Sequence, residues 1–381
     1  MKHKLCGVIG SYVKKLSTKN NPGGEFYLPD LKFIKEMLVG IINTGSAKIA
    51  KIAESLSKEN EKYKKVEKRL SYHLIKRNFY KIVMNCLFLL NKRYYRDAWI
   101  RYFVVDSSDI SGKQFKNSEF NEMVYDGSEK RKGKRIKPGY HLLNCIGVGL
   151  NRIYPLFGEL FSYESGDYNS ENEALINLFS KLHVLNSKIP IVSDRGTDRI
   201  KLYKPLIELK HPFIIRLCKD KRYLEYNGEN LYPETLSKRV ELKETFIGYN
   251  VRKNGKIYRC EYKVGLKKVK FTKATGVKVP KGFNLYLLIC KRRKNAFSYF
   301  LGFLPDSIPF NKVSSYMFEA YNSRWKIEEF HRWIKTEFKI EKMSLRRYIR
   351  LKNMYSLIML TRYRSIQASF SLSMVINSYL G

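Results

Sequence analysis

Two aspartates stand out because each follows a short apolar run that predicts a β-strand. Asp106 comes after residues 102–105, and Asp194 comes after residues 190–193. In open α/β sheets, ligands and catalytic groups gather at the carboxyl ends of strands, where a rigid element holds and exposes them. Aspartate is also a common turn residue after a strand, so the pair alone is weak evidence of a site.

A third acid, Glu328, lies in a segment with helical spacing. At 3.6 residues per turn, Tyr321 and Lys335 each fall about 20° from Glu328 around the helix axis. Arg324 falls about 40° away, whereas Glu329 points about 100° elsewhere. One acid, two bases and a phenol therefore share a narrow stripe. A solvated helix face with an Arg324–Glu328 ion pair would give the same pattern.

Together the three carboxylates predict a divalent-metal site. Asp106, Asp194 and Glu328 would supply hard oxygen ligands, which suit Mg²⁺, with Mn²⁺ as a substitute. Two such ions about 4 Å apart can activate a water or a 3′-hydroxyl during phosphodiester displacement. Arg324 and Lys335 would then hold the phosphates of the scissile strand. Asp109 and Asp198 lie close to the chosen aspartates in sequence and remain alternatives.

The composition indicates a polyanionic partner. The 381 residues include 73 Lys and Arg against 35 Asp and Glu, a net charge of +38. Phosphate neutralisation with counterion release favours nucleic acid for such a surplus. We expect no membrane partner, since no apolar run approaches the about 18 residues of a spanning helix. The six widely spaced cysteines argue against a zinc finger and favour a reduced, cytoplasmic setting.

The order of elements predicts an α/β fold with a ribonuclease-H-like mixed sheet. We expect three consecutive antiparallel strands, then a helix, a strand, a helix and a strand, at 102–105, 141–150, 152–157, 171–185, 190–193, 200–209 and 213–217. One long helix is expected over 314–338, and one or two more over 345–371.

The texture of the chain divides it into five expected regions. They are a basic helical N-terminal region (1–95), the first part of the catalytic core (96–218), a β-rich insertion (219–303), the last part of the core with the Glu helix (304–345) and a C-terminal helical region (346–381). The N-terminal helices would either read a DNA end or only cover the core, and helical periodicity does not separate these interpretations.

A family resemblance follows from these motifs. The pattern Tyr321-x2-Arg324-x3-Glu328-x6-Lys335 is similar, without a gap, to the Y-R-E-K signature of the insertion-sequence-four (IS-four) family of DDE transposases. The segments Val-Val-Asp-Ser-Ser at 104–108 and Val-Ser-Asp-Arg-Gly at 192–196 also resemble that family's first two catalytic blocks. The resemblance covers roughly residues 30–365.

The resemblance implies cut-and-paste transposition through a hairpin intermediate. In this picture Asp106 bridges two metal ions, while Asp194 and Glu328 each hold one. The phosphates near the transposon's 5′ end would be gripped by Tyr321, Arg324 and Lys335. The implied partners are double-stranded DNA, both terminal inverted repeats and target, and a second copy of the chain in a synaptic homodimer. The implied location is the bacterial cytoplasm, on the nucleoid when the protein is bound to DNA.

One departure concerns the base that such relatives stack on a tryptophan of the insertion during hairpin formation. None of the three tryptophans, Trp99, Trp325 and Trp333, lies in residues 219–300. Any π-face can stack a base, so the candidates are Tyr258, Tyr286, Phe297 and Tyr299. Trp325 is a further candidate, although we expect it to anchor the core.

Two other functions stay open at this point. A ribonuclease-H-like nuclease or junction resolvase would need the same carboxylates but would never join a 3′ end to a target. A catalytically silent DNA-binding protein descended from a transposase would keep the positive charge without the chemistry.

Overall fold

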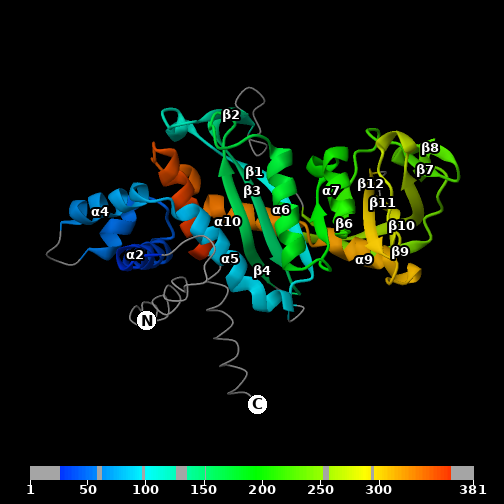
Figure 1. The fold of residues 1–381 in the computed structure, drawn as a ribbon, viewed down its shortest axis with the longest axis horizontal. Helices are drawn as coiled ribbons and strands as arrows, with labels where there is room; N and C mark the ends of the chain where they lie inside the picture. Colours follow the sequence, from blue (N-terminus) through cyan, green and yellow to red (C-terminus); the bar gives the residue numbers. More distant parts are fainter. Residues whose placement is uncertain are drawn as a thin grey trace, which may run out of the picture.

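The computed structural model describes residues 26–57, 62–96, 99–125, 135–150, 152–251, 257–292 and 296–361. The expected N-terminal and C-terminal regions therefore fall partly outside the described residues. Figure 1 shows a helical group at one end, a sheet through the middle and the strands of the expected insertion at the other end. No helix of this described part is long and apolar enough to cross a membrane.

Four helices precede the first strand, and five more follow in the rest of the labelled elements. They are α2 (Leu28–Thr44), α3 (Ile49–Leu56), α4 (Tyr63–Lys76), α5 (Phe79–Arg96), α6 (Glu171–Leu185), α7 (Ile200–Glu208), α8 (Pro233–Ser237), α9 (Phe310–Asn322) and α10 (Trp325–Thr336). Residues 348–361 are also helical. Short 3₁₀ turns lie at η1 (Lys113–Phe115), η3 (Arg195–Thr197), η4 (Lys273–Thr275) and η5 (Ile340–Lys342).

Twelve strands form one mixed sheet. They are β1 (Tyr102–Ser111), β2 (Glu122–Tyr125), β3 (Ile136–Val148), β4 (Ile153–Phe161), β5 (Ile191–Ser193), β6 (Phe213–Arg216), β7 (Leu224–Tyr226), β8 (Glu229–Leu231), β9 (Glu244–Val251), β10 (Ile257–Phe271), β11 (Phe283–Arg292) and β12 (Ala296–Pro305). Their order is β2-β3-β1-β5-β6-β12-β11-β10-β7-β8, with β4 paired to β3 and β9 paired to β10. The pairs β1–β5 and β5–β6 are parallel, as the two crossover helices α6 and α7 require.

The strands of residues 219–303 continue the same sheet rather than forming a separate one. β12 pairs antiparallel with β6, with Phe300 opposite Arg216 and Phe303 opposite Phe213. β11 and β10 then extend the sheet outward. The backbone hydrogen bonds of β6 therefore depend on a strand that follows it by about eighty residues in the sequence.

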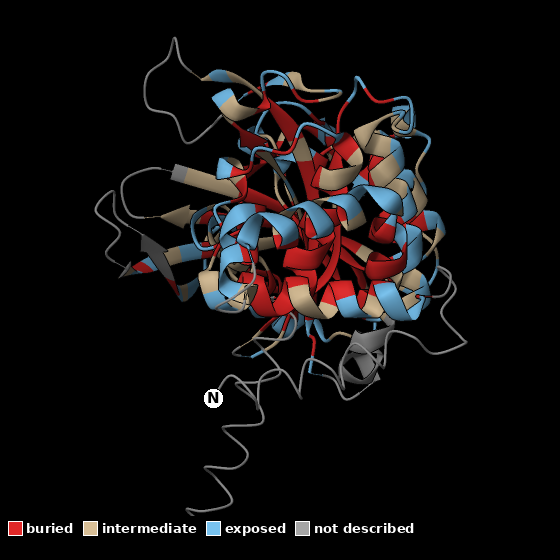
Figure 2. Cartoon of the chain, turned by 90° about the vertical axis from the view of Figure 1, so that its left-hand side faces the viewer, coloured by how far each residue is buried: buried red, intermediate tan, exposed pale blue. Residues whose placement is uncertain are grey.

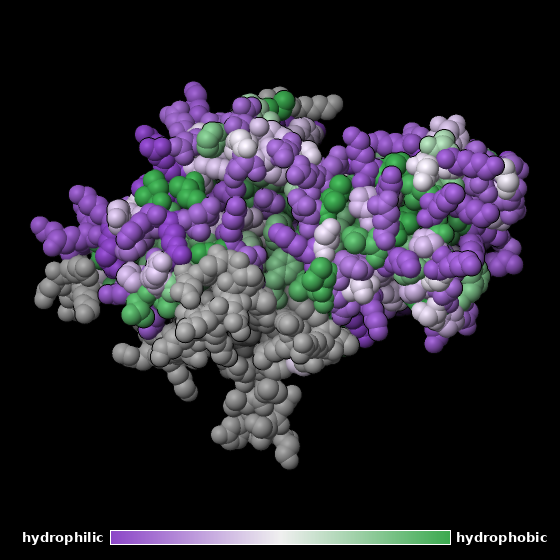
Figure 3. Space-filling model, in the orientation of Figure 1, coloured by the Kyte–Doolittle hydropathy of each residue, from purple (hydrophilic) through white to green (hydrophobic). Residues whose placement is uncertain are grey.

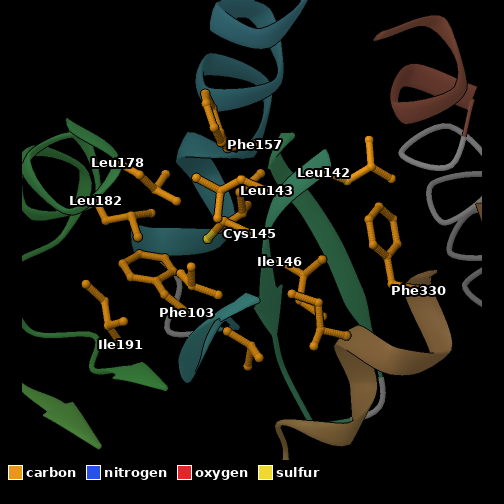
Figure 4. Close-up of a cluster of buried hydrophobic side chains, with 14 of the residues drawn as sticks. Phe103, Leu142, Leu143, Cys145, Ile146, Phe157, Leu178, Leu182, Ile191 and Phe330 are labelled. Carbon is orange, nitrogen blue, oxygen red and sulfur yellow. The ribbon is translucent and has the colours of Figure 1, made fainter. Parts of the chain in front are cut away.

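The core lies on both faces of the strands β1 and β3. Figure 4 shows Leu178 and Leu182 of α6 on one side of these strands and Phe330 of α10 on the other. Alternate residues of β3 point to opposite faces, and the strand is buried from Tyr140 to Val148 apart from the half-buried His141. In Figure 2 the outer faces of the helices are exposed, and the faces turned toward the strands are buried.

The N-terminal helices pack on the rest of the chain. Phe33 of α2 stacks on Phe79 of α5 with ring centroids 5.4 Å apart. Asn353, which is fully buried, donates to the carbonyls of Leu74 and Arg77 and accepts from the amide of Tyr80. The group is therefore tied to the helix at 348–361. Hydrophilic side chains cover much of the visible surface of the N-terminal helices and of the insertion (Figure 3). Binding of a DNA end by these helices stays a prediction.

Three expectations about local structure were wrong. β1 does not end at Asp106 but runs on to Ser111, and the short strand β2 was not expected at all. The helix expected over 314–338 is broken between α9 and α10. There the amide of Arg324 donates to the carbonyl of Tyr321, and that of Lys326 to Ser323, each three residues back. This 3₁₀ spacing interrupts the α-helical hydrogen-bond pattern between α9 and α10.

Candidate active site

Asp106 lies where β1 loses its parallel neighbour. The pairing with β5 ends at Val105 opposite Ser193, so the next residue of β1 faces the open edge beside the end of β5. On its other side Asp106 is directly opposite Asn144 of β3. The amide of Ser107 donates to its Oδ1 at 3.0 Å, which holds the carboxylate. The site is thus set by the short length of β5, not by the end of β1.

Asp194 follows β5 directly, as the sequence predicted. Its Oδ1 accepts from the amide of Arg195 at 2.8 Å, and the residue caps the 3₁₀ turn η3. The hydroxyl of Thr197 donates to the carbonyl of Asp194 at 2.9 Å. The first bond holds the carboxylate, and the second holds the backbone of the turn that follows the strand.

The Arg324 guanidinium brings all three predicted acids together. Its Nη1 lies 3.4 Å from Oδ2 of Asp106 and 3.9 Å from Oδ2 of Asp194. Its Nη2 forms an ion pair with Glu328, which is four residues further along the chain. The Arg324 side chain is only 13% exposed, whereas that of Glu328 is 60% exposed. The same largely buried guanidinium therefore contacts Asp106, Asp194 and Glu328.

Two further side chains reach the carboxylate of Asp194. Tyr321 donates through its hydroxyl to Oδ1 of Asp194 at 3.3 Å, and its ring packs on Phe300 at 4.2 Å. Nη1 of Arg216 lies 3.8 Å from the same oxygen of Asp194. Arg216 is the last residue of β6 and was not among the predicted site residues. The expected strand at 213–217 placed Arg216 inside the strand, so the rule that selected the acids following strands did not find it.

Lys335 lies apart from the three acids. Its Nζ is 3.6 Å from Oδ1 of Asp109 and 3.6 Å from Oε1 of Glu341. The continuation of β1 past Asp106 supplies Asp109, so this alternative acid has the lysine as its partner. The helix stripe predicted from even 100° steps is therefore divided, with Tyr321 and Arg324 at the acids and Lys335 elsewhere.

Asp198, the other alternative acid, is part of a buried ion pair. Its side chain is fully buried, and Arg222, 9% exposed, donates to its Oδ1 at 2.6 Å. The amide of Cys218 and the hydroxyl of Tyr203 also donate to this carboxylate. These contacts give Asp198 a structural role and leave Asp194 as the acid that faces the site.

Glu171, at the start of α6, is an additional acid that sequence reasoning missed. It lines a small cavity of about 50 Å³ together with Asp106 and Asp194. The hydroxyl of Ser107 donates to its Oε1 at 2.7 Å, and Arg199 pairs with its Oε2 at 2.6 Å. Glutamate in the first turn of a helix is common for electrostatic reasons, so its spacing carried no signal.

The electrostatics of the site favour positive charge. Burial raises the pKa of Asp106 to about 7, and the nearby Asp194 carboxylate adds to the rise, whereas Arg324 opposes it. Burial also raises the pKa of Tyr321 to about 12. Two carboxylates at close range cannot both be charged without a compensating cation. Tyr321 keeps its proton near neutral pH and acts as a donor.

The donor set suits a hard divalent cation, although the side chains are not arranged around one. Among the described residues, no group of three or more His, Cys, Asp and Glu side chains is placed to hold a metal ion. The guanidinium of Arg324 takes the central position instead. The carboxylates of Asp106, Asp194 and Glu328 are the oxygen ligands that Mg²⁺ and Mn²⁺ prefer, and a cation already contacts each of them. By their chemistry these three acids fit the divalent metal ions that the family resemblance implies.

The aromatic candidates differ in exposure. Tyr286 and Tyr299 are each only 4% exposed and offer little ring surface to a base, so their use for base stacking stays a prediction. Phe297 and Tyr258 are half-buried and stay candidates. The expectation that Trp325 anchors the core was wrong. It is 40% exposed at the start of α10, and the ammonium of Lys326 lies 4.0 Å from its ring centroid.

Comparison with known protein families matches residues 100–363 to the family described as "Transposase DDE domain". The chain belongs to the DDE transposase family. The matched part of this transposase runs from the start of β1 through α10 and includes all three predicted acids. Comparison with curated proteins gives no significant match.

One solved structure similar to this transposase is a cryo-EM structure of the piggyBac transposase synaptic complex with hairpin DNA. The two chains share 11% sequence identity, and the match covers 97% of this chain and 74% of the other, with a TM-score of 0.46. A similarity of this extent defines neither the detailed fold nor the chemistry of the transposase described here.

Proposed function

We propose that this DDE transposase cuts the ends of an insertion sequence and joins them to target DNA, as a member of the IS-four group with a ribonuclease-H-like core. One observation carries the proposal. Asp106 of β1, Asp194 after β5 and Glu328 of α10 all form ion-pair contacts with the guanidinium of Arg324. The net charge of +38 suits a DNA partner.

The acids would act as ligands and the neighbouring cations as phosphate-binding groups. Two divalent ions held by Asp106, Asp194 and Glu328 would lower the pKa of an attacking water or hydroxyl and stabilise the leaving oxygen. Arg324, released from these carboxylates, would bind the non-bridging oxygens of the scissile phosphate in its planar fork. Tyr321 would donate a hydrogen bond to a phosphate on the same side.

The reaction is an in-line displacement at phosphorus. A water oxygen forms the new P–O bond while the bond to the bridging 3′ oxygen breaks, which leaves a 3′-hydroxyl and a 5′-phosphate. In the joining step, that 3′-hydroxyl loses its proton as it attacks a phosphate of another strand, and the displaced oxygen gains one. A hairpin forms when the attacked strand is the opposite strand of the same end. We propose a hairpin intermediate, with Phe297 or Tyr258 as the stacking residue.

The same proposal includes the substrates, the oligomeric state and the location of the protein. Its substrates would be double-stranded terminal inverted repeats and target DNA, bound by a homodimer in the bacterial cytoplasm. The ammonium of Lys335 pairs with Asp109 and Glu341, so it would have to leave both acids to bind a phosphate. The N-terminal helices would contact the DNA ends through their basic outer surface.

The experiment compares two neighbouring glutamates on α10. Duplexes carrying the repeats that flank the coding sequence are incubated with the protein and Mg²⁺, and products are separated on denaturing gels. Glu328→Gln should reduce cleavage by more than about 100-fold, since it removes a ligand of a group worth several kcal/mol. Glu329→Gln is the matched control, because Glu329 pairs with Lys326 and Arg332 instead.

Each alternative function predicts a different product. Cleavage without any joining of 3′ ends would replace the proposal with a nuclease or resolvase. Binding of the duplex without cleavage in Mg²⁺ or Mn²⁺ would replace it with a silent DNA-binding protein. Equal cleavage by wild type and Glu328→Gln would show that the assignment of the site is wrong.

A further inference from the structure

Three residues form a row across adjacent strands beneath the candidate active site. Asp106 of β1 is directly opposite Asn144 of β3, and Asn144 is directly opposite Gly158 of β4. Directly opposite residues of antiparallel strands place their side chains on the same face of the sheet. The contacts of Asn144 with His331 of α10 show which face this is. The row therefore leads from the catalytic candidate Asp106 into the core under the Glu helix.

Asn144 links this row to two helices. Its Nδ2 lies 3.1 Å from Nε2 of His331, and the hydroxyl of Tyr355 donates to its Oδ1. Asn144 and Tyr355 are fully buried, and His331 is 8% exposed. His331 is three residues after Glu328 on α10, which makes the two side chains neighbours on the helix surface. The strand beside Asp106 is thus bonded to the helix that carries Glu328.

The direction of these hydrogen bonds is determined. Nδ2 of Asn144 can only donate, so Nε2 of His331 is the acceptor. Burial lowers the pKa of His331 to about 3, which keeps that ring neutral. The amide oxygen of Asn144 is then free to accept from Tyr355. Each partner uses a different atom of the same amide, so a shift of either helix would leave a buried polar atom unpaired. An unpaired polar group in the core would destabilise the shifted arrangement.

Gly158 provides the space for Tyr355. A Cβ at position 158 would clash with the Tyr355 hydroxyl and would meet its Cζ at 2.9 Å. The ring can therefore lie over the strand only because residue 158 has no side chain. The position next to Asn144 is shaped so that the tyrosine reaches the amide.

We propose that Asn144 is a positioning residue that, held by Tyr355, fixes α10 through His331 and so places Glu328 beside Asp106. The inference rests on the proposed function, because it assigns the network to the geometry of the carboxylate site. Outer partners that orient metal ligands typically change metal affinity or activity by about 10–100-fold when they are removed. The expected effect is thus on metal binding and not only on stability.

The test measures Mn²⁺ binding by the full chain and hydrogen exchange of the peptide at 325–336. Asn144→Leu should weaken Mn²⁺ binding by about tenfold or more and should lose protection in that peptide. Asn353→Leu is the matched control, since Asn353 is equally buried and hydrogen-bonded but joins α4, α5 and the helix at 348–361. It should lower thermal stability and leave Mn²⁺ binding unchanged. Equal weakening by both variants would overturn the inference.

Two smaller substitutions keep the test decisive if Asn144→Leu does not fold. Tyr355→Phe removes one hydroxyl and should still weaken Mn²⁺ binding. His331→Gln retains a hydrogen-bond acceptor and should recover most of the affinity that His331→Leu loses. Wild-type affinity in Tyr355→Phe and His331→Leu would refute the positioning role. Failure of the wild type itself to bind Mn²⁺ or to cleave DNA would instead count against the proposed function.

Discussion

Replacing Arg222 with leucine should strongly destabilise the protein, because it leaves the Asp198 carboxylate charged and buried. Arg222 donates to Oδ1 of Asp198 through Nε at 2.9 Å and through Nη2 at 2.6 Å, and it also donates to the Asp198 carbonyl at 3.1 Å. After the substitution, Asp198 would keep only the amide of Cys218 and the hydroxyl of Tyr203. The prediction separates Asp198 from Asp194, the two aspartates that follow β5.

The magnitude follows from the burial of the pair. The two side chains are 0% and 9% exposed, and removal of one partner of a buried ion pair costs about 3–5 kcal/mol. Arg239→Leu is the control, because the Arg239–Glu229 pair has a similar length of 2.7 Å but side chains that are 49% and 59% exposed. An exposed pair of this kind contributes less than about 1 kcal/mol.

Urea unfolding of the wild type and both variants measures the difference. Adding Asp198→Asn to Arg222→Leu should recover part of the lost stability, since it removes the unpaired charge. The amide oxygen can still accept from the amide of Cys218, and the amide nitrogen can donate to the hydroxyl of Tyr203. A loss below about 1 kcal/mol in Arg222→Leu, equal to that of Arg239→Leu, would refute the reasoning. Asp198 would then again be a candidate for catalysis.

Three other substitutions test the site and its support. In a chelating buffer, Asp106→Asn should stabilise the protein by an amount that grows from near zero at pH 4 to at most about 4 kcal/mol above pH 7. The reason is that the pKa of Asp106 is about 7 in the folded state against 3.8 in the unfolded state, so folding opposes ionisation of this carboxyl. Thermal unfolding at a series of pH values measures the difference, with Ser108→Ala as the control. Arg324→Ala should lower metal-free stability and increase the rise in melting temperature caused by Mn²⁺, since repulsion among the carboxylates loses its internal cation. Gly158→Ala should cost about 1–3 kcal/mol in urea unfolding through its clash with Tyr355.

The strand logic located most of the carboxylate site from sequence. Asp194 follows a buried strand as expected, and Asp106 lies at the same edge although its strand continues. What patterning could not show is that β5 is only three residues long, and that length is what leaves Asp106, in the middle of β1, without a paired residue on the β5 side. The length of a pairing depends on both strands, whereas periodicity describes each strand alone.

The helical arithmetic failed at Lys335, although Lys335 and Glu328 lie on the same unbroken helix, α10. Even steps placed Tyr321, Arg324 and Lys335 on one stripe with Glu328. The hydroxyl of Ser323 donates to the carbonyl of Ala320 at 2.6 Å, and this bond competes with the regular helical pattern at the break. Lys335 pairs with Asp109, which lies in a part of β1 that the sequence did not predict. Long-range partners of this kind are absent from local spacing.

The shared hydrogen bonds of β6 and β12 limit how the architecture can change. A deletion of residues 219–303 would strip β6 of its outer neighbour and leave Ile214 and Ile215 on an uncovered edge, which is a template for aggregation. The strands of residues 219–303 are consequently required to cover β6 and cannot be removed without loss of that cover. A shortened variant would need another segment to cover that edge in order to keep the end of β6 in place, where Arg216 contacts Asp194.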